Sequence, residues 1–218
     1  MRGVAGAESA RERDGPHGAK WNKPDGPSYY GRVADIPEIY SLRRVALGFD
    51  DVAYGVGGIE LYQVGALEVA QTGYSVDASG RSLTGNGDGD WSPDWIVIGF
   101  ETACGDPIFL STRPPHPVFT AMHGQGDWSP GMIAPSIERF WDCLETFRRF
   151  AAGRGSPVEA ETNPPDDIQI EAYLREVLRF CDGKPAACGF WAVEAQIGMN
   201  DERWGLRVEH LLATGELG

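Results

Sequence analysis

The sequence predicts an α+β fold with a mainly antiparallel sheet and helices packed on it. The first observation is a series of three short apolar runs, WIVIGF from residue 95, PIFLS from residue 107 and PVFTAM from residue 117. The connections between them are shorter than the dozen or more residues that a parallel crossover needs, so the runs are expected to pair as an antiparallel meander. The second observation is an apolar stripe of helical period from residue 137, which predicts a helix that covers the inner face of the sheet.

Upstream of the meander, the stretch IPEIYSLRRVALGFDDVAYGVGGIELYQV predicts a helix, a turn and a strand. Pro37 suits the first turn of a helix, and the pair Gly57 and Gly58 precedes residues that alternate between apolar and polar. The apolar positions of this first helix are Ile39, Leu42, Val45 and Ala46.

Two further helices are predicted in the C-terminal half of the chain. On the polar side of the first, Glu145 and Arg149 have the i, i+4 spacing of an ion pair. The second begins at Asp166, a capping residue with Gln169 three positions later, and ends before DGKP. The apolar stripes are Ile137, Phe140, Trp141, Leu144, Phe147 and Ala151 in the first helix, and Ile170, Tyr173, Leu174, Val177, Leu178 and Cys181 in the second. Farther on, GFWAVEA and LRVEHLL are each predicted as a short strand or helix.

Polar segments divide the chain into three parts. Residues 1–33 are rich in glycine, proline and charge, with no hydrophobic period, and are expected to form a flexible leader without chemistry. Residues 34–152 hold the predicted domain. The polar segment GRGSPVEAETNPP begins residues 153–218, which are predicted to be a linker followed by a C-terminal extension of helix and strand.

The composition disfavours several classes of protein. The net charge of −13 opposes direct binding to nucleic acid, and no run approaches the roughly 18 apolar residues of a membrane span. The start of the chain does not resemble a secretory signal, so a cytoplasmic protein is expected. The four cysteines match no zinc or redox spacing and are expected to be reduced and buried; they are Cys104, Cys143, Cys181 and Cys188.

The acidic residues are unevenly distributed. Between residues 50 and 127, eleven carboxylates stand against only Arg81 and Arg113. This excess of negative charge increases solubility. Its electrostatic field also accelerates the encounter with a basic partner. Charge alone does not choose between these two roles.

A seven-residue pattern occurs twice, as GDGDWSP over residues 87–93 and as GQGDWSP over residues 124–130. Its glycines permit positive φ, its aspartate can bond nearby backbone, and Ser-Pro suits the start of a short helical turn. Shared loop chemistry is therefore favoured over a shared ligand site. A calcium loop at NGDGD (residues 86–90) is disfavoured, because the sixth position is Trp91 and the twelfth is Val97.

Catalysis is the less favoured alternative. His123 with Asp106 or Asp127 forms a general acid and base only if these side chains meet in space, and a histidine after a strand more often bonds a neighbouring loop. His116 and His123 lack the spacing of helical metal ligands. No catalytic residue, metal or cofactor is expected.

Three segments together resemble the SUKH superfamily, a bacterial group similar to fungal cell-wall-assembly regulators. They are WIVIGFETACGDPIFLST, PVFTAMHGQGDW and IAPSIERFWDCL, in which the family motifs match Ile98-Gly99, residues 105–109, residues 117–119 and residues 136–141. IPEIY and GGIELY also resemble family elements, although Val56 replaces an asparagine and Ile137 an aromatic residue. The resemblance covers about residues 34–150.

The resemblance implies an α+β domain that many bacteria use as an immunity protein against polymorphic toxins. It implies occlusion of a basic toxin domain, such as a nuclease, without an enzymatic mechanism. The alternatives are a general interaction or regulatory module and, less favoured, a His/Asp hydrolase. The residues expected to bind the partner are Asp88, Asp90, Trp91, Asp106, His123, Asp127 and Trp128, with the two tryptophans as aromatic anchors.

Overall fold

The computed structural model describes residues 51–182 and 185–199, together with residues 36, 38, 40, 41 and 210. The predicted leader lies outside these residues. So does most of the first predicted helix, of which residues 38, 40 and 41 are described and are helical. Of LRVEHLL only His210 is described, and it is helical.

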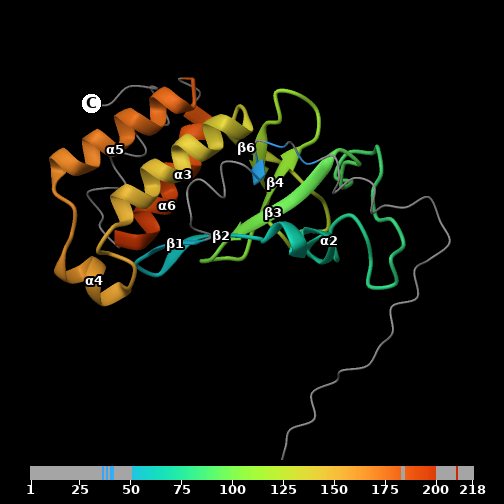
Figure 1. Cartoon of the computed structure of the whole chain (residues 1–218), viewed down its shortest axis with the longest axis horizontal. Helices are drawn as coiled ribbons and strands as arrows, with labels where there is room; N and C mark the ends of the chain where they lie inside the picture. Colours follow the sequence, from blue (N-terminus) through green and yellow to red (C-terminus); the bar gives the residue numbers. More distant parts are fainter. Residues whose placement is uncertain are drawn as a thin grey trace, which may run out of the picture.

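Six strands form one sheet in chain order, and every neighbouring pair is antiparallel (Figure 1). The strands are β1 (Asp51–Tyr54), β2 (Gly57–Leu61), β3 (Trp95–Glu101), β4 (Pro107–Ser111), β5 (Val118–Thr120) and β6 (Gly131–Ala134). The predicted class is confirmed, and β3, β4 and β5 are the predicted meander. The sequence interpretation missed β1 and β6, neither of which lies in one of the apolar runs that marked the other strands.

Alternate residues of the central strands enter two separate cores. Ile96 and Ile98 of β3 lie in a large core shared with the helices. Val97, between them, belongs to a smaller core on the other face, together with Trp91 and Phe109. Both faces of β3 are therefore buried, and this is why it has the sequence of a nearly continuous apolar run.

A short helical segment lies between β2 and the loops that lead to β3. It consists of η3 (Val64–Ala66) and α2 (Leu67–Ala70), and Gln71 follows directly. The buried Gln71 amide donates to the carbonyl of Val97 at 2.9 Å and accepts from the Val97 N–H at 3.0 Å. This side chain satisfies β3 backbone groups where β2 does not reach.

The longer helices gather on the side of the larger core (Figure 1). They are α3 (Ile137–Ala151), α5 (Asp167–Phe180) and α6 (Pro185–Met199). Ser136 caps α3. Asp166 caps α5 in a capping box with Gln169, as predicted. The predicted pair of Glu145 with Arg149 is wrong. Glu145 pairs with Arg148 at 2.7 Å, because α5 lies beside α3 and Arg149 reaches Glu176 there at 2.9 Å.

The segment from residue 153 is more ordered than a polar linker. Its central residues form α4 (Pro157–Thr162). Arg154 is only 5% exposed and donates to the carbonyls of Phe150 and Asn163 and to the side chain of Gln169. Its own carbonyl accepts from the N–H of Gly55 at 2.8 Å. The extension is thus tied to the sheet, and α5 and α6 share the larger core.

GFWAVEA is helical, as part of α6, which resolves the open choice between strand and helix. Trp191 donates its indole N–H to the carbonyl of Ile133 in β6 at 2.8 Å, so α6 is bonded to an outer strand of the sheet. Three cysteines from α3, from the end of α5 and from α6 are buried, as predicted, but Cys104 is exposed in the β3–β4 turn. The prediction of a buried thiol is wrong for Cys104.

Candidate binding face

The two copies of the repeated pattern lie against each other on the sheet face opposite α3, α5 and α6. The indoles of Trp91 and Trp128 meet edge to face, with ring centroids 5.0 Å apart. The N–H of Trp128 donates to the carbonyl of Gly89 at 2.9 Å. A Cβ atom on Gly89 would lie 2.6 Å from that of Asp127, so only glycine allows this approach. Two segments 37 positions apart in the sequence thus form one surface.

The first copy is a compact turn closed by its own aspartate. The Asp90 carboxylate accepts the N–H of Gly87 at 2.8 Å, and Gly85 donates to the carbonyl of Trp91 at 3.1 Å. This is the aspartate-to-backbone bond predicted for the pattern. In the second copy, Ser129 and Pro130 lead directly into β6, so the short helical turn predicted there is wrong.

Trp91 is the centre of an aromatic cluster beneath both copies. It is 1% exposed, and its ring contacts Tyr74, Trp95, Phe109 and Trp128 at centroid distances of 4.8–5.4 Å. The prediction that Trp91 is a surface anchor is therefore wrong, because the small core takes up its ring. Trp128, at the same position of the pattern, is only partly buried.

A groove of about 650 Å³ opens between the two copies. Its first wall is the glycine-rich turn with Asp88 and Asp90, and its second is the segment from Trp128 to Gly131. The indoles of Trp95 and Trp128 also line it. The complete lining is Gly85, Asn86, Gly87, Asp88, Gly89, Asp90, Ser92, Trp95, Trp128, Ser129, Pro130 and Gly131.

The carboxylates around the two copies fall into two classes. Asp94 is paired with Arg113 at 2.5 Å, and Asp77 with Arg81 at 2.9 Å. Asp88, Asp90 and Asp127 are exposed, and within the described part of the chain no ion pair includes them. The face therefore carries uncompensated negative charge close to the groove.

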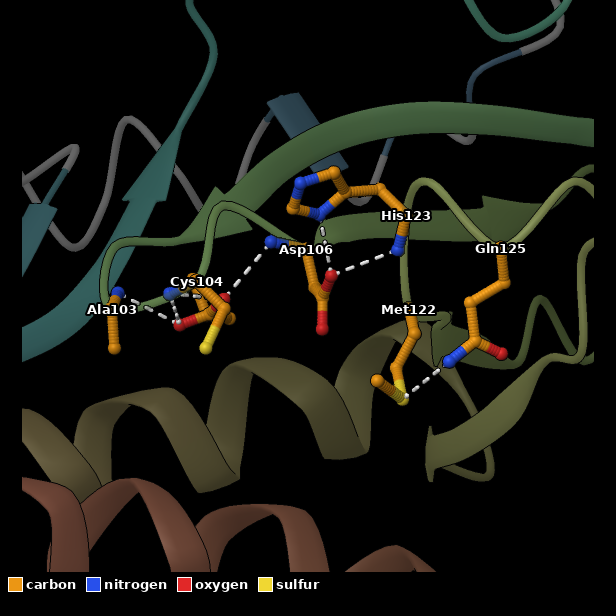
Figure 2. Close-up of polar contacts among 7 residues, drawn as sticks. Ala103, Cys104, Asp106, Met122, His123 and Gln125 are labelled. Carbon is orange, nitrogen blue, oxygen red and sulfur yellow. Dashed lines mark hydrogen bonds and ion pairs between the residues drawn. The ribbon is translucent and has the colours of Figure 1, made fainter.

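His123 and Asp106 meet at the neighbouring turns (Figure 2). Asp106 Oδ1 lies 2.7 Å from His123 Nδ1 and accepts the His123 backbone N–H at 2.9 Å. Because a carboxylate only accepts, Nδ1 carries the proton in this contact. Within the described part of the chain, Asp127 forms no hydrogen bond or ion pair with either of these two side chains.

Asp106 is itself held by the turn that contains it. Glu101, only 4% exposed, accepts the backbone N–H groups of Ala103, Cys104 and Asp106 at 2.8–3.0 Å. Glu101 also raises the pKa of the Cys104 thiol, with smaller contributions from desolvation and other carboxylates. This thiol is a poor nucleophile at neutral pH. The His123–Asp106 contact thus latches the end of β5 to the β3–β4 turn.

Sequence reasoning missed Glu194 of α6. This residue is 3% exposed, and its Oε2 has no hydrogen-bond partner among the described residues. Burial, with smaller contributions from Glu101 and Asp106, raises the pKa of Glu194 to about 8. The available signal was a single acidic residue inside the apolar run GFWAVEA, but the side on which it would pack was not readable.

The described residues contain no group of three or more histidine, cysteine or acidic side chains placed to hold a metal ion. None of the described helices combines the length and the apolar character needed to cross a bilayer. The fold and the site define an α+β protein with helices over one face of an antiparallel meander and an acidic, tryptophan-lined groove over the other. No family model, curated protein or solved structure matches the chain.

Proposed function

We propose that this protein is a cytoplasmic immunity protein that neutralises a basic bacterial toxin by covering it, without making or breaking bonds. The observation that carries the proposal is the joining of the two repeated segments into one face with three uncompensated aspartates. A surface of this sign attracts a basic protein and disfavours acidic competitors. The resemblance of residues 34–150 to the SUKH superfamily supports the same role.

Two aspartates of the face test the proposal. Asp88→Lys with Asp127→Lys is expected to abolish growth protection against a toxin captured from a native lysate by this chain and then expressed with it. It is also expected to slow association of the purified proteins roughly tenfold or more and to flatten its dependence on salt. The matched control is Glu138→Lys with Glu161→Lys, which makes the same change in net charge at exposed helical positions.

Each outcome of this experiment decides between roles. Equal protection by both double variants would remove this face from the proposal. Binding of the toxin without growth protection by the wild-type chain would favour the general interaction module instead.

The His123–Asp106 contact supports one rival proposal, that of a His/Asp hydrolase. Under the occlusion mechanism, His123→Ala is expected to keep growth protection within about twofold, because the pair serves only as a latch. A hydrolase screen of the wild-type chain and this variant is the check. Turnover of any substrate that is lost in His123→Ala would reverse the ranking of the two proposals.

A further inference from the structure

The groove between the two repeated segments combines three features that together describe a ligand site. It has a volume of about 650 Å³, within the roughly 300–1,000 Å³ of ordinary ligand sites. It is lined by two partly buried indoles, those of Trp95 and Trp128. It carries exposed carboxylates at Asp88 and Asp90.

These features favour a cation with a flat, weakly hydrated surface. An indole ring attracts a cation placed over its face, and a carboxylate pairs with it through charge-assisted hydrogen bonds. A phosphate or a carboxylate ligand would meet repulsion from Asp88 and Asp90. A guanidinium uses both surfaces at once, since it is planar, stacks on aromatic rings and presents a fork of donors, whereas an ammonium is a compact, strongly hydrated charge.

The same chemistry already occurs within this chain. Asp94, just after the first repeated segment, is bound by Arg113. The guanidinium of Arg179 lies 4.6 Å from the ring centroid of Phe180, and that of Arg154 lies 5.6 Å from the ring centroid of Phe150. The groove contains the aromatic rings and the carboxylate that such contacts with a guanidinium need. Asp88 has no ion-pair partner among the described residues.

We propose that the groove is a recognition site for an arginine side chain of a protein partner, with the guanidinium placed between Asp88 and the indoles of Trp95 and Trp128. This rests on the proposed function, because the partner is taken to be a basic protein. It goes further by assigning one residue type of that partner to one site. The preformed turn, closed by Asp90 and packed on Trp91, orders the site before binding and so reduces the entropy lost on association.

The probe for this proposal is arginine blocked by an N-acetyl and a C-methylamide group, titrated into the full ¹⁵N-labelled chain. The indole N–H resonances of Trp95 and Trp128 are expected to shift saturably, while those of Trp141 and Trp191 on the other side of the sheet stay in place. Blocked lysine is expected to bind more weakly, and blocked citrulline, which has the same shape without the charge, is expected not to bind.

Asp88→Asn is expected to weaken binding of blocked arginine up to about fivefold, as for the loss of one exposed ion pair. Glu161→Gln, which removes one carboxylate from exposed α4, is the matched control and is expected to leave the affinity unchanged. Equal shifts with citrulline, shifts away from the two indoles, or no shift at saturating probe would each overturn the proposal.

The probe also separates this inference from the proposed function. Binding of blocked arginine by a chain that gives no growth protection would end the immunity proposal and keep the site. Protection that survives Asp88→Asn, in a chain whose indoles ignore the probe, would end the arginine site and keep the immunity proposal.

Discussion

Glu194→Gln is expected to raise the free energy of unfolding by several kcal/mol at about pH 9 and to leave it nearly unchanged at about pH 4. Burial, together with the carboxylates of Glu101 and Asp106, raises the pKa of Glu194 from 4.5 to about 8. At pH values between these two pKa values, the folded chain keeps a proton on Glu194 that the unfolded chain has released. The stability of the folded chain therefore decreases as the pH rises through this range. At roughly 1.4 kcal/mol per pKa unit, the loss over this interval is on the order of 5 kcal/mol, and glutamine avoids it.

The groups that face Glu194 come from other parts of the fold. Glu101 is the last residue of β3 and Asp106 lies just before β4, so both flank the β3–β4 turn, and Tyr173 belongs to α5. Burial raises the pKa of Tyr173, with a smaller contribution from Glu194, so the Tyr173 hydroxyl stays protonated throughout this pH range. The ionised Glu194 therefore meets acidic neighbours and no described cation, and ionisation opposes the docking of α6 on the turn.

Urea unfolding of the wild type and of Glu194→Gln at several pH values is the measurement. Other titrating groups are common to both proteins, so the difference between the two curves isolates Glu194. Glu161→Gln, at an exposed position of α4, is expected to give a curve parallel to that of the wild type. A parallel curve for Glu194→Gln as well would show that Glu194 is not a buried, proton-linked group.

Trp91→Ala is expected to lower the free energy of unfolding by roughly 3–5 kcal/mol, the usual cost of emptying a large buried aromatic site. It removes ring contacts with Tyr74, Trp95, Phe109 and Trp128. The first repeated segment then loses its support on the sheet. The indole resonances of Trp95 and Trp128 are therefore expected to broaden or move, and the groove is expected to lose its affinity for blocked arginine.

Urea unfolding and the indole spectrum measure these two effects. Val69→Ala, at a position that is 73% exposed, is the control and is expected to cost less than about 0.5 kcal/mol. A loss below about 1 kcal/mol for Trp91→Ala, with an unchanged indole spectrum, would contradict the role of Trp91 as the support of both segments.

The candidate face was only partly predictable from the residues. Asp88, Asp90, Asp127 and Trp128 lie together at the groove or at its rim, as the shared composition of the two segments suggested. His123 and Asp106 meet at a separate latch beside it. Trp91 is buried although its segment is nearly identical to that of Trp128, because its ring lies at the centre of the small core while that of Trp128 packs on the edge of it.

The sequence by itself determined β2, β3, β4, β5, α3 and α5, with Asp166 as a helix cap. Their signals, an alternating or helical apolar pattern and a capping residue, arise within a few neighbouring positions. The tertiary structure decided the partner of Arg149 and the burial of Arg154 and Glu194. It also decided that Trp91 is fully buried and Trp128 only partly buried. Each of these depends on which distant segments meet, and the free energy of such contacts is set by packing and desolvation that no local pattern records.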